Sequence, residues 1–462
     1  MTFPAYPDYR DSGVEWLGVV PEHWGVKPLR YLGRFRKGLT ITKADLTDIG
    51  IPCLNYGEVH SLYPFEVNQD IQALKCVPAE YLETEPSSCI SYGDFVFADT
   101  SEDLEGVGNF THVSGSEPLF AGYHTIIYSL DSDVSSRFLA YCLESFAFRT
   151  QLRMGVKGVK VFSVTQEILR GGIAWIPTTA EQTQIARFLD HETARIDALI
   201  KEQQRLIELL KEKRQAVISY AVTRGLDPTV PMKDSGVEWL GEVPVHWEVS
   251  RLKFVTKIID CKNRTPEYID DGEYLVVRTS NVKNQTLGLV GALYTDEANF
   301  KVWTQRGVPP VGSILFTREA PAGEVCLVPE AVPLCLGQRM MNIIPHDLGC
   351  TAFLFDFLTS DCLTRYIESV AHGSTVSHLR VEQIYDIPIA IPPLNEQVQI
   401  DKLVSELKRK YSGLISEANQ AVLLLHERRS ALVFAAVTGK IDVRGWQLPV
   451  SVQAPTLEAE AI

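Results

Sequence analysis

The feature that most constrains this chain is a long internal repeat. Segment 11–24 reads DSGVEWLGVVPEHW and segment 234–247 reads DSGVEWLGEVPVHW, so 12 of 14 positions are identical at an offset of 223 residues. Self-similarity over a long period indicates a duplicated structural unit. The 462 residues are therefore expected to form two copies of one fold, and not a series of unrelated domains.

The repeat continues more faintly along both copies. Further matching pairs are 51–59 with 274–282, 93–97 with 312–316, and 181–185 with 396–400. The ends of the repeated unit are alike, whereas its middle has diverged. This pattern suggests one scaffold that carries two different functional surfaces.

Two kinds of segment alternate along the chain. The segments 1–178 and 227–393 contain short apolar runs broken by Gly, Pro and Asp, which indicates strands and turns with some short helices. The segments 179–226 and 394–443 contain few Gly or Pro residues and predict two long helices. We therefore expect an α+β protein in which two globular domains alternate with two long helices, followed by a disordered tail at 444–462.

Apolar residues recur along both long segments at alternating steps of four and three. In the first segment the series is Ile185, Leu189, Glu192, Ile196, Leu199, Gln203, Leu206, Leu210, Lys213, Val217 and Tyr220. Such a seam predicts a coiled coil. Because one chain holds two equivalent helices, an internal antiparallel pair with a pseudo-two-fold is favoured. Packing of each helix on its own domain, or a seam between two chains, remains an alternative.

The bulk composition limits the compartment and raises one objection. The sequence has no apolar stretch long enough for a membrane span, no signal-peptide pattern, and nine scattered cysteines without a C-x-x-C pair, which predicts a cytoplasmic protein that does not contact membranes. The net charge of −14 counts against binding to nucleic acid. A local positive surface would nevertheless suffice for such binding.

The sequence lacks the common signatures of catalysis. There is no phosphate-binding G-x-x-x-x-G-K-[ST] loop and no H-E-x-x-H pair, so neither ATP hydrolysis nor a bound metal is expected. The run from Ile391 to Asn395 lacks the residues that an adenine methyltransferase loop requires on either side of its prolines. We expect no catalytic residue, metal or cofactor in this chain, and we interpret the tryptophans of the repeated segment, such as Trp24 and Trp247, as packing anchors.

Three motifs together resemble the specificity subunit of type I restriction–modification systems. They are D-S-G-V-E-W-L-G-E-V-P-x-H-W, the I-P-x-x-x-E-Q-x-Q-I helix entry at 176–185 and 391–400, and A-V-T-G-K-I-D at 436–442. The resemblance implies two target-recognition domains that each read one half of a split site in double-stranded DNA. It also implies helices that dock two methyltransferase subunits, and restriction motor–nuclease subunits in the full enzyme, with S-adenosylmethionine, ATP and Mg²⁺ bound by those partners.

Two other functions stay open at this point. One is a stand-alone DNA-binding regulator built from the same repeats, and the other is an enzyme whose site has no recognisable signature. The missing motifs count against the enzyme, and the long helices with their repeated tryptophan segment favour a subunit of an assembly over a regulator.

Residues that could contact DNA gather at equivalent places in the two copies. Reading of bases uses Arg or Lys toward guanine and Asn or Gln toward adenine, and further donors position the phosphates. The first copy offers Arg34, Arg36, Lys37, Lys43, Asn55, Tyr56, Tyr123, His124, Lys157 and Lys160. The second copy offers Lys257, Lys262, Arg264, Arg278, Asn281, Gln338, Arg339, Ser374 and Thr375.

Overall fold

The computed structural model describes residues 3–158, 160–261, 264, 266–330, 332–370 and 378–449. It contains two compact units, Met1–Glu202 with Ala421–Ile462 and Gln203–Gln420, and each is described by itself. Three of the residues predicted to contact DNA, Lys262, Ser374 and Thr375, lie outside the described residues.

Two sheets form the centre of the first unit. The five-stranded sheet has the order β4 (Gly33–Lys37), β13 (Thr125–Leu130), β9 (Phe95–Ala98), β11 (Phe110–Val113) and β6 (Phe65–Val67). The four-stranded sheet has the order β7 (Cys76–Val77), β5 (Ile51–Leu54), β12 (Leu119–Ala121) and β8 (Cys89–Ile90).

Strand β9 is apolar throughout because side chains on both of its faces are buried. Successive side chains of a strand point to opposite faces of the sheet. Phe95 and Phe97 lie in the core that includes the helices, whereas Val96 and Ala98 lie in a second core shared with β5 and β12. Both faces of the five-stranded sheet are therefore covered.

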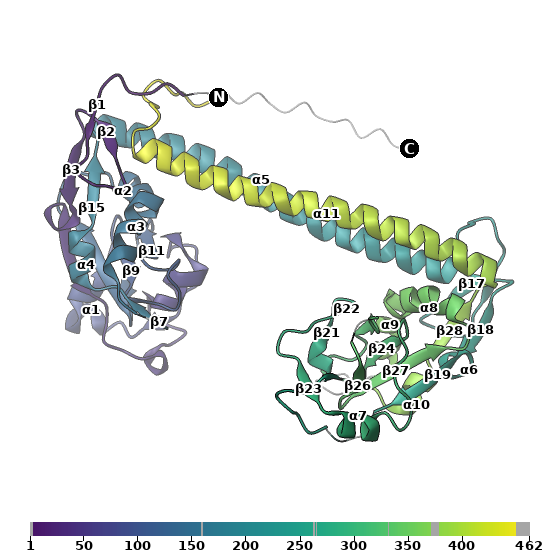
Figure 1. The fold of residues 1–462 in the computed structure, drawn as a ribbon. Helices are drawn as coiled ribbons and strands as arrows, with labels where there is room; N and C mark the ends of the chain where they lie inside the picture. Colours follow the sequence, from purple (N-terminus) through teal and green to yellow (C-terminus); the bar gives the residue numbers. More distant parts are fainter. Residues whose placement is uncertain are drawn as a thin grey trace. The chain divides into compact units, whose positions relative to one another are not determined.

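Short helices cover the outer face of this sheet, and Figure 1 shows α2 and α3 beside β9 and β11. The helices of the domain are α1 (Tyr81–Thr84), α2 (Ser136–Glu144), α3 (Phe146–Gly155) and α4 (Gln166–Gly171). Ser135 and Ser145 accept hydrogen bonds from backbone N–H groups in the first turns of α2 and α3. These N-caps fix where the two helices begin.

The second unit repeats this architecture with fewer strands. One sheet has the order β19 (Thr256–Asp260), β27 (Met340–Pro345), β24 (Ile314–Thr317) and β25 (Val325–Leu327), and the other β23 (Leu293–Thr295), β20 (Tyr274–Val277) and β26 (Leu334–Leu336). Its helices are α6 (Leu252–Val255), α7 (Glu297–Trp303), α8 (Thr351–Leu358), α9 (Asp361–Val370) and α10 (Val381–Tyr385). The α+β prediction is confirmed.

Short two-stranded pairs complete the described domains. In the first unit they are β1 (Tyr9–Asp11) with β2 (Val19–Pro21), β3 (Gly25–Pro28) with β15 (Ile173–Ile176), and β10 (Thr100–Ser101) with β14 (Phe162–Ser163). In the second unit they are β16 (Met232–Asp234) with β17 (Glu242–Pro244), β18 (Glu248–Arg251) with β28 (Pro388–Ile391), and β21 (Val282–Lys283) with β22 (Thr286–Leu287).

The two long helices are α5 (Thr179–Arg224) and α11 (Leu394–Val437). In the first unit they run antiparallel, because Gln184 near the start of α5 donates to the carbonyl of Val443 beyond the end of α11, and Asp197 pairs with Arg429 at 2.9 Å. In the second unit Ile218 and Val222 of α5 share a core with Ile400 of α11. No helix among the described residues is long and apolar enough to cross a membrane.

The predicted seam is right at the start of α5 and wrong further along. Ile185, Leu189 and Ile196 are buried as expected, but Leu199 and Leu206 are 46% and 43% exposed. Ile200 and Ile207, one residue further along, are buried instead. A straight helix has 3.6 residues per turn, so a strict 3.5-residue series drifts off the buried face after a few turns.

The start of the predicted disordered tail also needs correction. The ring of Trp446 packs edge-on against Phe188 of α5 at 5.3 Å, and the Gln184 side chain donates to the carbonyl of Trp446 at 2.5 Å. Residues 444–449 therefore belong to the first unit, and 450–462 lie outside the described residues. An aromatic side chain this close to an apolar helix surface outweighs the polar composition around it.

Candidate nucleic-acid interface

The strongest candidate for a shared binding surface is a pair of turns at equivalent places in the two repeats. Turn 122–124 joins β12 to β13, and turn 337–339 joins β26 to β27. Their last residues, His124 and Arg339, have φ values of 56° and 71°. Two non-glycine residues in the left-handed region at the same position of both copies show that the turn geometry itself is repeated.

The same backbone hydrogen bonds hold both turns. Gly122 donates to the carbonyl of Leu54 and Gly337 to that of Val277, both at 2.8 Å. The carbonyl of His124 accepts from the N–H of Asp99 at 3.1 Å, and that of Arg339 accepts from Arg318 at 2.9 Å. The two turns therefore have one backbone framework, on which different side chains are mounted.

A second loop beside each turn is repeated in the same way. The N–H of Asn55 donates to the carboxylate of Glu58, and the N–H of Arg278 donates to the side-chain carbonyl of Asn281, both at 3.0 Å. Adding a Cβ to Gly122 would place it 2.0 Å from the Asn55 side chain. Loop and turn are thus in close contact, which explains the glycine at this position.

This arrangement corrects two of the predicted contacts. Asn55 and Asn281 are only 1% and 2% exposed. The Asn281 amide donates to the carbonyl of Gly288 at 3.0 Å while its oxygen accepts from Arg278. Both amides hold the loops from inside, so they do not face DNA, and sequence alone could not distinguish a loop amide that points inward from one that points outward.

In the first domain the turn gathers aromatic side chains. The Tyr56 ring lies 6.1 Å from that of Tyr123 and 5.9 Å from that of His124. His124 Nδ1 lies 3.1 Å from the carboxylate of Asp99. Burial raises the pKa of Tyr123 above its usual range.

Two open hollows meet at His124. One, of about 490 Å³, is lined by residues that include Tyr56, His60 and Asp103, and the other, of about 600 Å³, includes Lys37 and Tyr123. Four predicted residues, Lys37, Tyr56, Tyr123 and His124, are therefore brought together. Concave surfaces that combine aromatic faces with hydrogen-bonding groups suit contact with bases and the sugar–phosphate backbone.

In the second domain the turn gathers charges instead. Arg339 pairs through Nε with Glu319 at 2.5 Å, and the other oxygen of Glu319 lies 3.0 Å from His378. Arg318 pairs with Asp260 at 3.2 Å, and Arg306 lies 3.8 Å from the same carboxylate. The backbones of Glu319 and His378 also form a β-bridge, which corresponds to the strand pairing of Thr100 with Ser163 in the first domain.

Sequence reasoning missed Arg306, Arg318 and His378. A signal for Arg318 was present, because it follows GSILF at 312–316 by the same interval as Asp99 follows GDFVF at 93–97. The other two lie in stretches where the copies have diverged, and no sequence pattern marks them.

The remaining predicted residues divide into exposed and engaged side chains. Lys43, Lys157, Lys160, Lys257, Arg264 and Gln338 are exposed, as is Arg34, which pairs with Asp131 at 3.4 Å. Arg36 is engaged inside its domain, where it donates to the carbonyls of Ser87 and Cys89 and to the Ser129 hydroxyl. Arg278 donates to the carbonyl of Gly291 at 2.9 Å. These bonds give Arg36 and Arg278 structural roles that the sequence did not reveal.

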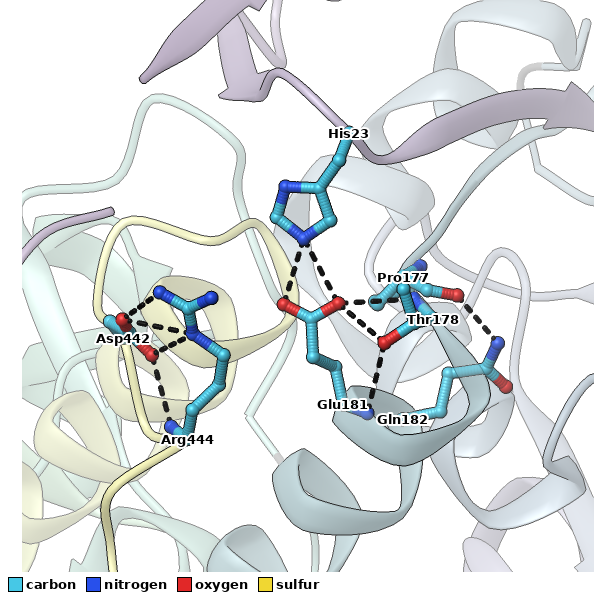
Figure 2. Close-up of polar contacts among 7 residues, drawn as sticks. All are labelled: His23, Pro177, Thr178, Glu181, Gln182, Asp442 and Arg444. Carbon is cyan, nitrogen blue, oxygen red and sulfur yellow. Dashed lines mark hydrogen bonds and ion pairs between the residues drawn. The ribbon is translucent and has the colours of Figure 1, made fainter. Parts of the chain in front are cut away.

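A separate polar cluster lies where α5 begins (Figure 2). His23 Nε2 lies 2.9 Å from the carboxylate of Glu181, which also accepts from the hydroxyl and N–H of Thr178. Burial acts to raise the pKa of Glu181, but the bonds from Thr178 and His23 outweigh it and hold that pKa below its usual range. The N–H of Glu181 donates in turn to the Thr178 hydroxyl at 3.4 Å, so the two residues form a capping box at the start of α5.

The second unit repeats only part of this cluster. His246 Nε2 lies 2.7 Å from Glu396, but Pro393 stands where the first copy has Thr178, so no hydroxyl cap is possible. Trp24 and Trp247 are each 1% exposed, and a Cβ on Gly439 or Gly225 would lie 3.2 or 3.4 Å from their rings. The tryptophans therefore anchor the repeated segment on the end of α11 in the first unit and of α5 in the second, as expected.

Comparison with known proteins gives a consistent family. A model described as the type I restriction modification DNA specificity domain matches residues 244–423. The chain is 25% identical over 441 residues to the putative type I restriction enzyme MjaX specificity subunit of Methanocaldococcus jannaschii, covering 93% of this chain and 96% of the relative. It is 21% identical over 451 residues to the EcoKI specificity subunit of Escherichia coli, covering 92% and 91%.

A solved structure supports the fold. A chain from a structure described as the basis of complex assembly and conformational transition of the type I R-M system is similar with a TM-score of 0.65 at 15% identity. The similarity covers 91% of this chain and 99% of that one. In the part of this chain that the structure describes, no group of His, Cys, Asp or Glu side chains could hold a metal ion.

Proposed function

Because the chain belongs to the family of type I restriction–modification specificity subunits, we propose that it reads a bipartite site in double-stranded DNA, one half-site per domain. The observation that carries this proposal is the repeated turn, with His124 in one copy and Arg339 in the other. One backbone framework with different side chains is what two domains with different target sequences require.

The chemistry of the full enzyme would then lie on other subunits. We expect two methyltransferase subunits per chain, because each unit offers one similar cluster of helix start, buried tryptophan and histidine–glutamate pair. Restriction motor–nuclease subunits would join the same assembly. S-adenosylmethionine, ATP and Mg²⁺ would bind to these partners and not to this chain.

One experiment tests the proposal. The chain is co-expressed with a methyltransferase subunit of a type I system from its own host, and methylated adenines are mapped across the host genome. The expected result is a single motif with two specified halves and an unspecified gap, which disappears when this chain is omitted. A motif with only one specified part, or methylation that does not depend on this chain, would contradict it.

The alternative of a stand-alone regulator has a different outcome. A regulator would bind its site with full affinity and specificity in the absence of a methyltransferase. Competition binding by the isolated chain against the mapped motif, compared with the co-expressed complex, separates the two.

A further inference from the structure

The geometry points to Arg339 as the residue that reads a guanine in the half-site of the second domain, with Glu319 as its positioning residue. This inference rests on the proposed function and deepens it by naming the base and the residue. It begins from the position of Arg339, which is exposed and ends the turn that both copies share.

The backbone at this position is unfavourable for an arginine. A left-handed conformation is strained for an L-residue with a side chain, and glycine would relieve that strain. Yet His124 and Arg339 both hold it, at φ values of 56° and 71°. Strain retained at the same exposed position in both copies indicates that a side chain is needed there.

The Arg339 side chain is also held in a defined orientation. Its Nε pairs with Glu319 at 2.5 Å, and Glu319 is itself fixed by His378 at 3.0 Å and is 21% exposed at its side chain. A guanidinium held through one edge presents its remaining N–H groups in a fixed direction. That is the requirement for two parallel hydrogen bonds to O6 and N7 of guanine.

The Glu319 carboxylate makes a DNA phosphate a poor partner for Arg339. Glu319 offsets the positive charge, which weakens attraction to the DNA backbone but preserves directed donors. Arg306 and Arg318 share the single carboxylate of Asp260, so a positive charge remains beside it. Arg306 is held through Nη1 by the carbonyls of Asp260 and Cys261, but its side chain is 54% exposed, and it is better suited to a phosphate. In the second domain, Arg339 thus supplies oriented hydrogen-bond donors for a base, and Arg306 supplies positive charge for a phosphate.

The first domain supplies a matched comparison. His124 has the same backbone position and also pairs with a carboxylate, but that carboxylate is Asp99, the residue equivalent to Arg318, whereas Thr100 stands in the place of Glu319. A histidine presents one donor or acceptor at a time toward a base and has no bidentate fork. The two half-sites should therefore differ at the base that faces this turn.

The test uses the co-expressed methyltransferase complex and a duplex library in which both mapped half-sites are randomised. For R339A we expect the preference for one guanine in the second half-site to fall by roughly 10- to 100-fold, while the first half-site is unchanged. E319Q should keep that guanine but lower its preference several-fold. R306A should weaken binding to all sequences equally and reduce its salt dependence.

Two further variants keep the test decisive. R339M keeps the length of the side chain and loses every hydrogen-bond donor, so it should lose the guanine preference even if R339A impairs assembly. H124A should alter the first half-site only. An R339A or R339M complex that still selects every guanine of the second half-site would overturn the assignment of Arg339 while leaving the proposed function intact. Absence of any bipartite motif in the unaltered complex would overturn both.

Discussion

The two turns of this protein have one backbone and opposite surroundings. Around turn 122–124 the structure places aromatic rings with Asp99 and Asp103, and around turn 337–339 it places Arg306 and Arg318 with their carboxylate partners. Asp99 and Arg318 occupy the same position, since the N–H of each donates to the last carbonyl of its turn. Duplication has preserved the hydrogen bonds of the main chain and left the charge of the surface free to change.

The comparison extends to the interior of the first domain, where the buried His112 should add an acid sensitivity that its counterpart in the second domain does not have. Burial, helped by the nearby Arg137, lowers the pKa of His112 from 6.5 to about 4, against opposing effects of Glu66 and Asp190. Because the folded pKa lies below the unfolded one, the neutral form stabilises the fold fully above pH 6.5. This stability is lost as the pH falls toward 4, by about 3 kcal/mol at most.

The equivalent residue of the second copy is Leu327, as the strand registers show. Urea unfolding at pH 7.5 and pH 5, with hydrogen exchange to assign each transition to a unit, measures the effect. H112L should remove this part of the acid sensitivity from the first domain and leave the second as it was. Equal acid loss in H112L and the unaltered protein would contradict the prediction.

Asn55 and Asn281, whose amides point inward, should differ in how much they stabilise their domains. N281A removes a bond to the carbonyl of Gly288 and the acceptor for the N–H of Arg278, so we expect a loss of about 2 kcal/mol in the second domain. N55A removes two longer contacts, to the carbonyl of Cys53 at 3.4 Å and from the Cys53 thiol at 3.8 Å, and should cost less. Unfolding of both variants under the same conditions tests the order.

Neither variant should change which bases are selected, provided that the complex remains folded. If N281A selected a different base at one position of the site while its stability was unaffected, Asn281 would belong to the residues that contact DNA. The distinction between residues that hold the loops and residues that face DNA would then be weaker.

The smallest expected difference concerns the starts of the two long helices. T178A removes a hydroxyl that exists only in the first copy, and should destabilise the start of α5 by about 1 kcal/mol. T179A, one residue further on, serves as the control and should have little effect. Hydrogen exchange of the peptides that cover the first turns of α5 and α11 measures this, and equal protection in T178A and T179A would argue against the cap.

The repeat predicted more of this molecule than composition did. Alignment of the two copies is enough to identify the glycines at Gly122 and Gly337 and the turns that follow them, because a duplicated framework keeps its special backbone positions. Both long helices were predicted correctly in type and in where they begin, but α11 ends at Val437 and not at residue 443. In α5 the predicted buried face fails beyond Ile196, because a strict 3.5-residue series drifts off one face of a straight helix. Trp446 was assigned to a tail although its ring has a partner in Phe188.

The side chains of the candidate site were harder to predict. Asn55 and Arg36 are of the residue types that contact DNA, yet the interior of the domain uses both of them. Arg306 and Asp260 are 46 residues apart in the sequence, so no local pattern indicates that their side chains meet. Residue type identifies a candidate, and only the fold shows in which direction it points.

The first unit is assembled from both ends of the chain, and this determines when it can be completed at the ribosome. Its core includes Val433, Ala436 and Val437, and the N–H of Asp442 donates to the carbonyl of Pro4 at 2.7 Å. The second unit, Gln203–Gln420, is continuous and is synthesised entirely before those residues emerge. The part of the protein made first should therefore finish folding last. A nascent chain of which residue 420 but not residue 433 has left the ribosome would carry a folded second domain and an N-terminal region that still lacks the last turns of α11.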